Sequence, residues 1–292
     1  DGPTIAHAAV HLARHVDAID LNCGCPQHIA KRGHYGAFLL DEPDLIVSVV
    51  RHLSSVLDLP VCVKIRILPD PQATLSLALR LQEAGCAMLT VHGRTREQKS
   101  RGECSWEAIA QLKAQLHIPV VANGGIERPE DIDACLAATG ADAVMISEAA
   151  LENPAIFAGK ATTRKSQVAL AREYMDMVAQ HEPLSHSDVK AHLFKLLYMC
   201  LCDKAPVRNE LAAAITHQHL REIFERIVDE ESVLREGNEA FEARCDQDDA
   251  PFRSWYRRHR RPPGPDAHAE EGVVGSEGDP IGEKAGDAPG TL

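Results

Sequence analysis

The sequence predicts an α/β fold with a parallel sheet, followed by a smaller helical domain. Over the first 160 residues, short apolar segments of strand length alternate with helical patterns, which is typical of βαβ units. Several of these segments end in Asn-Gly, His-Gly or Asn-Cys-Gly, and polar residues gather at the same ends. These observations predict five strands of an incomplete (β/α)8 (TIM) barrel, a fold whose ligands bind beyond the carboxyl ends of the strands.

Each element of the first domain, residues 1–160, follows from its local pattern. A helix is predicted over Thr4–Val16, and the apolar segment 17–21 is predicted to be a buried strand that feeds a tight loop. The other strands are predicted at Val61–Ile67, Ala87–His92, Ile118–Asn123 and Ala141–Ser147. The intervening helices are predicted at Pro43–Leu57, Thr74–Ala84, Trp106–Leu116 and Pro129–Ala138. Ser105 suits an N-cap, and Pro129 suits a first helical turn.

Polar side chains share one face of several predicted strands. Lys64 and Arg66 alternate with apolar residues in one strand, and Thr90 and His92 do so in the next. An unpaired buried cation is costly, so these cations need an anion or a polar ligand. For any one of these residues a structural salt bridge is the alternative, and Arg66 in particular is expected to pair with an acid such as Asp20. The repeated pattern favours a ligand site.

A cysteine-containing loop follows the first predicted strand. The run Asn22–Pro26 holds Cys23 and Cys25 and turns through Gly24 and Pro26. A cysteine in such a loop lacks steric cover, which favours a chemical role. The alternative is a buried structural cysteine, because a free cysteine often packs as a small apolar residue.

The sequence resembles the tRNA-dihydrouridine synthases over residues 1 to 235. Five segments occur in the order found in that family, each weak by itself and strong together: Asp20–Gln27, Lys31–Ala37, Lys64–Arg66, His92–Lys99 and Ala122–Gly124. The first two are most similar to the eukaryotic branch that acts on positions 16 and 17 of the tRNA D loop.

The resemblance implies an FMN-dependent reduction of the uridine C5=C6 bond with NADPH as the reductant. Hydride transfer belongs to the cofactor, while the protein orients it and supplies a proton. The family motif places the proton donor directly before the proline, which makes Cys25 the general acid and Cys23 a structural residue. A free thiol is mostly protonated at neutral pH and can donate.

The resemblance also implies which residues contact FMN. Lys64 corresponds to the lysine that meets the pyrimidine edge of the flavin, and His92 to a flavin-contacting histidine. The remaining cofactor-binding residues implied for the phosphate end are Asn123, Gly124, Gly125, Ser147 and Glu148. Glu148 is unfavourable beside a phosphate, so backbone N–H groups or Ser147 are expected to make the contact there.

The resemblance implies tRNA as the partner, with no obligate protein partner. Asn22 is expected to shape the uridine pocket. The residues expected to bind tRNA phosphates are Lys31, Arg32, Arg94, Arg96 and Lys99, with Arg101 beside them. No metal site is expected, because the sequence has no Cys-x-x-Cys motif.

In the family, three strands precede the first helix, so the resemblance implies that the five strands are the last five of the barrel and that the chain is truncated at its N-terminus. An open sheet leaves strand edges and part of the core exposed. The chain by itself is therefore expected to fold marginally, to bind FMN poorly and to show little synthase activity.

Residues 165–236 predict a small bundle of four helices, which in the family binds tRNA. A simple packing domain is the alternative. The helices are predicted at Gln167–His181, Ser187–Cys202, Glu210–His217 and His219–Leu234. Residues 237–292 are predicted to be a disordered tail with a basic cluster at Arg253–Arg261. The cluster is compatible with RNA binding, with nuclear localisation or with a solvated run.

The composition favours a reducing compartment. The chain has nine cysteines and a net charge of −12, and much of the acidic excess lies in the tail. No segment is apolar enough to span a membrane. The expected location is the cytoplasm, with the nucleus as a second location if the basic cluster acts as a targeting signal.

Two other functions remain open at this point. One is a different flavin barrel enzyme, similar to dihydroorotate dehydrogenase, which would not need the basic residues or the helical bundle. The other is a catalytically inactive RNA-binding remnant, suggested by the missing strands.

Overall fold

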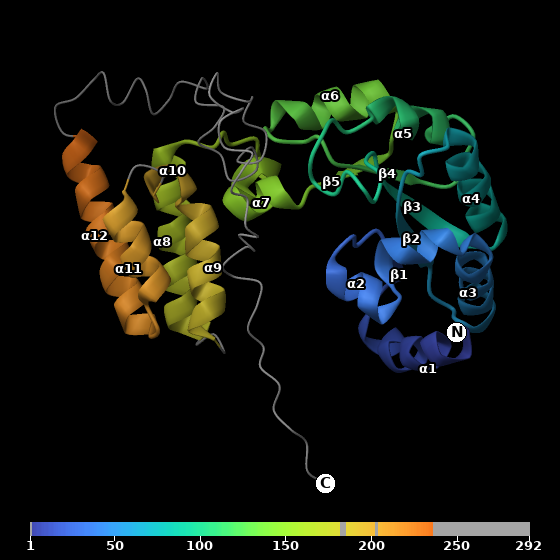
Figure 1. Cartoon of the computed structure of the whole chain (residues 1–292), viewed down its shortest axis with the longest axis horizontal. Helices are drawn as coiled ribbons and strands as arrows, with labels where there is room; N and C mark the ends of the chain where they lie inside the picture. The colour runs from blue at the N-terminus through green and yellow to red at the C-terminus, as the bar shows by residue number, and fades with distance from the viewer. Residues whose placement is uncertain (1, 182–184, 202–203, 236–292) are drawn as a thin grey trace, which may run out of the picture. The chain divides into compact units, whose positions relative to one another are not determined.

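A computed structural model describes residues 2–181, 185–201 and 204–235 (Figure 1). The chain forms two compact units and passes from the first to the second between Thr162 and Thr163. The basic cluster and the tail that the sequence predicts after residue 236 lie outside the described residues.

The first unit contains one parallel sheet of five strands, in the order β1-β2-β3-β4-β5 (Figure 1). The strands are β1 (Ile19–Cys23), β2 (Val61–Arg66), β3 (Cys86–His92), β4 (Val120–Asn123) and β5 (Ala143–Met145). The predicted α/β class and the five parallel strands are confirmed. The expectation that three further strands precede these five in the complete barrel stays a prediction.

Helices precede, connect and follow the strands of this unit. They are α1 (Gly2–Leu12), α2 (His28–Gly33), α3 (Pro43–Val56), α4 (Pro71–Glu83), α5 (Trp106–Lys113), α6 (Glu130–Thr139) and α7 (Glu148–Glu152), with 3-10 turns at Ala13–His15, Gly36–Asp41 and Pro154–Ala158. Helices α3 to α6 pack along the sheet in chain order, from α3 on β2 and β3 to α6 on β4 and β5. This order is the expected consequence of repeated βα units.

The core of the first unit lies between the sheet and these helices. Alternate residues of β2, Val61, Val63 and Ile65, are at most 1% exposed. Facing helices present apolar residues at helical spacing, including Leu53 of α3 and Leu81 of α4, both fully buried. The opposite face of the strands is therefore left for the polar side chains.

Side-chain caps set where two of the helices begin. The predicted Ser105 cap is present, since Ser105 Oγ accepts a hydrogen bond from the Ala108 amide at 3.1 Å. Helix α4 begins at Pro71 rather than at Thr74, because Asp70 accepts from the Gln72 amide and starts the helix earlier.

The prediction of a buried first strand was wrong. Strand β1 covers residues 19–23 rather than 17–21, and Asp20 and Asn22 are exposed while Cys23 is fully buried. These residues are exposed because β1 pairs with β2 on one side only and forms an outer strand of the described sheet. Its polar residues therefore lie at an edge.

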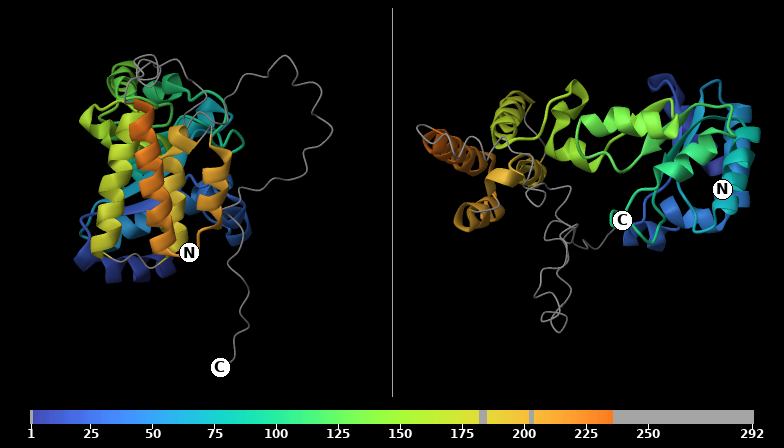
Figure 2. Two further views of the ribbon diagram at one scale, coloured as in Figure 1. Left: turned by 90° about the vertical axis from the view of Figure 1, so that its left-hand side faces the viewer. Right: turned by 90° about the horizontal axis from the view of Figure 1, so that it is seen from above.

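The second unit is helical, with five described helices instead of the predicted four. They are α8 (Arg164–His181), α9 (His186–Leu196), α10 (Tyr198–Leu201), α11 (Ala205–Ala213) and α12 (His217–Arg235). Helix α9 ends earlier than predicted and α10 follows it as a separate short turn. Helices α8, α9 and α12 lie side by side (Figures 1 and 2) and bury an apolar core that includes Met175, Leu193 and Phe224.

A buried ion network ties the helices of the second unit together. Glu231 of α12 is 1% exposed, and its Oε1 lies 3.2 Å from Arg164 Nη1 and 3.1 Å from Lys204 Nζ. Arg164 itself is 5% exposed. Arg164 and Lys204 therefore share this buried carboxylate, and Lys204 also pairs with Glu230 at 2.9 Å.

We expect Glu231→Ala to lower the free energy of unfolding of the second unit by about 3–5 kcal/mol, because it removes the buried carboxylate of the ion pair with Arg164. The control is Glu225→Ala, which breaks an ion pair with Arg172 whose partners are 45% and 46% exposed. That change should cost about 1 kcal/mol or less. Urea unfolding followed by circular dichroism measures both. Equal losses in the two variants would contradict the account.

Among the described residues, no helix combines the length and the apolar character needed to cross a membrane.

Candidate active site

The strand register brings the predicted site residues together at the carboxyl edge of the sheet. Asn22 of β1 pairs with Lys64 of β2, and Lys64 pairs with Thr90 of β3. Two residues further along comes the row Arg66, His92, Asn123 and Met145. Because residues two apart share a face, Lys64 and Arg66 project from the same side of the sheet as His92. The candidate site therefore lies at the ends of the strands and includes the cations Lys64 and Arg66.

The loop that carries Cys25 is held by short contacts. The Gly24 amide donates to Asn22 Oδ1 at 3.0 Å, and the Ala37 amide donates to the Cys25 carbonyl at 2.9 Å. Gly36 has a φ of +65°, and a Cβ there would lie 2.7 Å from the Cys25 carbonyl oxygen. Any larger residue at position 36 would displace the cysteine. Sequence reasoning gave Gly36 no functional role.

The two cysteines of the loop differ in exposure. Cys25 is half-buried, and its Sγ lies 3.9 Å from Gln27 Oε1. Cys23 is fully buried. Burial, with a smaller contribution from Asp20, raises the pKa of the Cys23 thiol to about 12. Cys25 is thus the accessible thiol of the loop, and Cys23 packs inside.

Arg66 does not pair with Asp20 as the sequence predicted. Its Nε donates to the Gly24 carbonyl at 2.7 Å, and its Nη1 donates to the carbonyls of Thr95 at 3.1 Å and Lys99 at 2.8 Å. Arg66 is 6% exposed. One guanidinium therefore holds the Cys25 loop and the loop after β3 together.

Lys64 lies against the same loop. A Cβ on Gly24 would be 3.4 Å from Lys64 Nζ. Burial and the charge of Arg66, opposed in part by Asp20, lower the pKa of Lys64 to about 8. The ammonium group is largely charged at pH 7 but loses its proton within about one pH unit above that.

His92 is neutral in this site. Burial, together with the charges of Arg66, Lys64 and Arg94, lowers the pKa of His92 to about 2. An imidazole with so low a pKa is not a proton donor at neutral pH in the way an imidazolium would be. The thiol of Cys25 is then the better candidate for a proton donor.

The turn after β4 exposes backbone amides. Gly124 and Gly125 have φ values of +96° and +80°, and the Gly124 carbonyl accepts from Trp106 Nε1 at 3.0 Å. Within the part of the chain that the structure describes, the Gly124 and Gly125 amides donate to no acceptor. Successive free amides of this kind suit an anion.

The other residues predicted to bind the cofactor phosphate have different positions. Asn123 is 5% exposed, and its side-chain amide donates to the Met145 carbonyl at 2.7 Å, so it joins β4 to β5. Ser147 is exposed directly before α7, and Glu148 is half-buried. The negative charge of Glu148 acts on Arg66.

The basic residues predicted to contact tRNA separate into two groups. Lys31, Arg32 and Lys99 are exposed. In contrast, Arg96 forms ion pairs with Asp41 at 2.7 Å and Glu97 at 3.1 Å.

Arg94 is 2% exposed and donates to the Gly102 carbonyl. Its burial does not fit the expected contact with a tRNA phosphate, because the guanidinium lies inside the unit.

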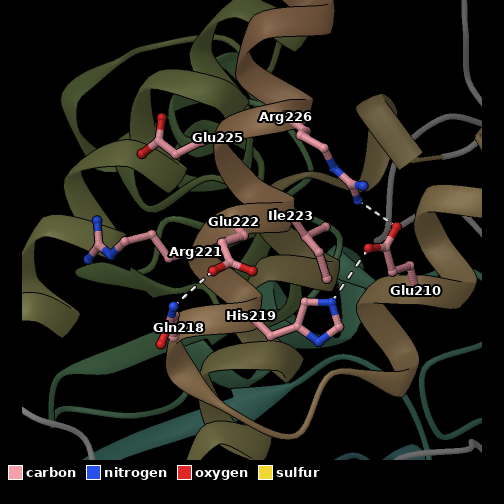
Figure 3. Close-up of a pocket in the computed structure, with 8 residues that line it drawn as sticks. All are labelled: Glu210, Gln218, His219, Arg221, Glu222, Ile223, Glu225 and Arg226. Carbon is pink, nitrogen blue, oxygen red and sulfur yellow. Dashed lines mark hydrogen bonds and ion pairs between the residues drawn. The ribbon is translucent and has the colours of Figure 1, made fainter.

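A pocket in the second unit contains none of these residues. Glu210 accepts from Arg226 and His219, and Gln218 donates to Glu222 (Figure 3). The pocket is lined by three glutamates and two arginines, and this excess of negative charge makes it unsuited to a phosphate. No group of three or more His, Cys, Asp or Glu residues within the described ranges is arranged to hold a metal ion.

A thiol, a lysine and a neutral histidine at the carboxyl edge of a parallel sheet lie where α/β barrel enzymes hold their active sites. Residues 2–245 match the family model described as "Dihydrouridine synthase (Dus)". The chain belongs to the dihydrouridine synthase family. This membership decides against the dihydroorotate-dehydrogenase-like alternative.

The curated relatives place the chain near one branch of the family. It is 45% identical over 219 residues to the mouse "tRNA-dihydrouridine(16/17) synthase [NAD(P)(+)]-like" protein, covering 74% of this chain and 45% of the relative. It is 41% identical over 223 residues to the "tRNA-dihydrouridine(16/17) synthase [NAD(P)(+)]" of Saccharomyces cerevisiae, covering 73% and 53%. The predicted similarity to the 16/17 branch is confirmed. The chain spans about half the length of the curated relatives it matches.

Proposed function

We propose that this chain supplies the proton-donating and cofactor-contacting part of an enzyme that reduces uridine at positions 16 and 17 of the tRNA D loop. The observation that carries the proposal is the position of Cys25. Its half-buried thiol lies on a braced loop beside Lys64 and Arg66, where His92 stays neutral. The names of the mouse and yeast relatives supply the substrate and the nicotinamide reductant, NADPH or NADH.

The residues fit FMN at two points. The consecutive amides of Gly124 and Gly125, both at positive φ, have no acceptor among the described residues and suit the phosphate of FMN. Lys64 and His92 offer a cation and a neutral ring at the neighbouring strand ends. FMN, when bound, supplies the hydride for the C6 position of uracil.

The chain's own residues supply the remaining chemistry. Cys25 Sγ donates its proton to C5 of uracil and is left as a thiolate, which regains a proton from water. Arg66 holds the loop in place through the Gly24 carbonyl. Lys64 adds positive charge where negative charge develops, the kind of preorganised stabilisation that lowers reaction barriers most.

The tRNA is proposed to contact the exposed cations of the first unit. Lys31 and Arg32 of α2 and Lys99 of the loop after β3 are available to phosphates. Binding through such contacts weakens steeply as salt rises. The second unit is proposed to support tRNA binding, and the proposed locations are the cytoplasm and the nucleus.

Deletion of the gene in its source organism tests the proposal. We expect dihydrouridine at tRNA positions 16 and 17 to be replaced by uridine, while dihydrouridine at other positions persists. Re-expression of the gene should restore both positions. Unchanged dihydrouridine at 16 and 17 after deletion would contradict the proposed function.

The charge of Lys64 predicts a pH dependence for FMN binding. Because the pKa of Lys64 is lowered to about 8, the ammonium form is present below that pH and is lost as the pH rises through it. We expect FMN affinity to fall about tenfold or more between pH 7 and pH 9.5, the size of one lost charge-assisted hydrogen bond.

Fluorescence titration of FMN at the two pH values measures this change. The matched control is Lys64→Arg, which stays charged throughout and should show a much smaller fall. An equal fall in both proteins would assign the pH dependence to another group.

A further inference from the structure

Arg94 and His92 form a pair inside the first unit. Arg94 Nη1 lies 3.3 Å from His92 Nε2, and Arg94 Nε donates to the Gly102 carbonyl at 2.9 Å. Arg94 is 2% exposed, and its Nη2 has no hydrogen-bond partner among the described residues. A buried guanidinium with an unused donor is costly, so its position needs a reason beyond packing.

The direction of the hydrogen bond follows from the chemistry of the two groups. A guanidinium carries five N–H donors and no acceptor, so the contact requires His92 Nε2 to accept. A neutral imidazole that accepts at one nitrogen carries its proton on the other. We infer that Arg94 is a positioning residue that holds His92 as the neutral ring with its proton on Nδ1, so that His92 presents a hydrogen-bond donor to its ligand.

The charges around the ring favour the neutral form from several elements. Three cations act on the ring, namely Lys64 and Arg66 on β2 and Arg94 after β3. The thiol of Cys104 lies close to the turn after β4. Protonating His92 would add one more positive charge to this group. Burial and these cations together account for its low pKa.

Gly124 allows the ring to take this position. A Cβ on Gly124 would lie 2.8 Å from both Cδ2 and Nε2 of His92. The edge of the ring that contains Nε2 is thus packed against the β4 turn and Arg94. Nδ1 belongs to the other edge of the ring.

A donor at Nδ1 selects the kind of ligand atom that His92 can bind. It fits a carbonyl oxygen or an unprotonated ring nitrogen, as on a flavin or a pyrimidine. Which of these it meets rests on the proposed function. The tautomer itself does not, because it follows from the Arg94 contact in the protein without ligand.

Nitrogen-15 NMR of the protein labelled in its histidine side chains tests the inference, with His92 assigned from a His92→Gln variant. We expect the Nδ1 signal of His92 at the position of a protonated nitrogen and the Nε2 signal at that of an unprotonated one. Neither signal should titrate between about pH 5 and 8. A proton on Nε2, or titration in this range, would overturn the inference.

Two substitutions test the part played by Arg94. Arg94→Gln, which can also accept a hydrogen bond, should shift His92 toward a mixture of tautomers. Arg80→Lys, on the surface of α4 where Arg80 pairs with Asp44, should leave the signals unchanged. A pure Nδ1–H tautomer in folded Arg94→Gln would show that Arg94 does not set it.

The spectrum of the unchanged protein decides the tautomer even if Arg94→Gln does not fold. A failed tautomer prediction would leave the gene-deletion result for tRNA unaffected, so the two proposals fail separately.

Discussion

Replacing Cys25 with alanine is expected to lower the rate of dihydrouridine formation about a hundredfold or more, the usual cost of removing a general acid. Cys25 is half-buried, and among the described residues its thiol has one weak hydrogen bond, to Gln27 Oε1 at 3.9 Å. The substitution should therefore leave the fold intact. The rate is measured with protein purified from the source organism, FMN, NADPH and an unmodified tRNA transcript.

Cys23→Ala is the matched control, since it removes a thiol two residues away. Cys23 is fully buried, and burial raises its pKa to about 12, so its loss should reduce stability modestly and leave the chemical step in place. Equal loss of rate in the two variants, or loss with Cys23→Ala only, would reject Cys25 as the proton donor.

Replacing Arg66 with alanine is expected to have the largest effect on the stability of the first unit. The guanidinium donates to the carbonyls of Gly24, Thr95 and Lys99 from a position that is 6% exposed. Hydrogen bonds from a charged donor contribute about 1.5–3 kcal/mol each and are not additive. We expect the free energy of unfolding to fall by about 3 kcal/mol or more.

Denaturant unfolding of the first unit measures this loss, and Arg51→Ala is the control. Arg51 is exposed on α3, so its removal should change stability by about 0.5 kcal/mol or less. Hydrogen exchange adds a second measurement. Arg66→Ala should increase exchange in both the Cys25 loop and the loop at Thr95–Lys99. Increased exchange in one loop only would contradict the role of Arg66 as the link between them.

The alternation of strands and helices was readable from the sequence because it depends on local patterns. Apolar residues at spacing two in β2 and a Ser105 cap are properties of short segments, and the structure has both. The site could be located for the same reason. Lys64, Arg66 and His92 lie near strand ends, and the parallel register brings strand ends to one edge.

The partners of the arginines could not be read from the sequence. Arg66 was expected to meet an acid, but it binds three carbonyls from two loops. Arg94 was expected to contact tRNA and lies buried beside His92. Spacing along the chain does not show which distant backbone oxygens a long side chain reaches.

The exposure of β1 was missed for a related reason. The apolar residues around Ile19 and Leu21 predict a buried strand, but burial also depends on how many neighbours a strand has. Strand β1 is an outer strand of the described sheet, and its residues Asp20 and Asn22 are exposed. That property belongs to the sheet as a whole.

The central claim is that Cys25 donates the proton when uridine in tRNA is reduced. Its most direct test is a Cys25→Ala change at the native gene, with dihydrouridine mapped position by position in the cell's tRNA. We expect positions 16 and 17 to carry uridine while the level of the protein stays normal. Dihydrouridine retained at both positions in that strain would contradict it.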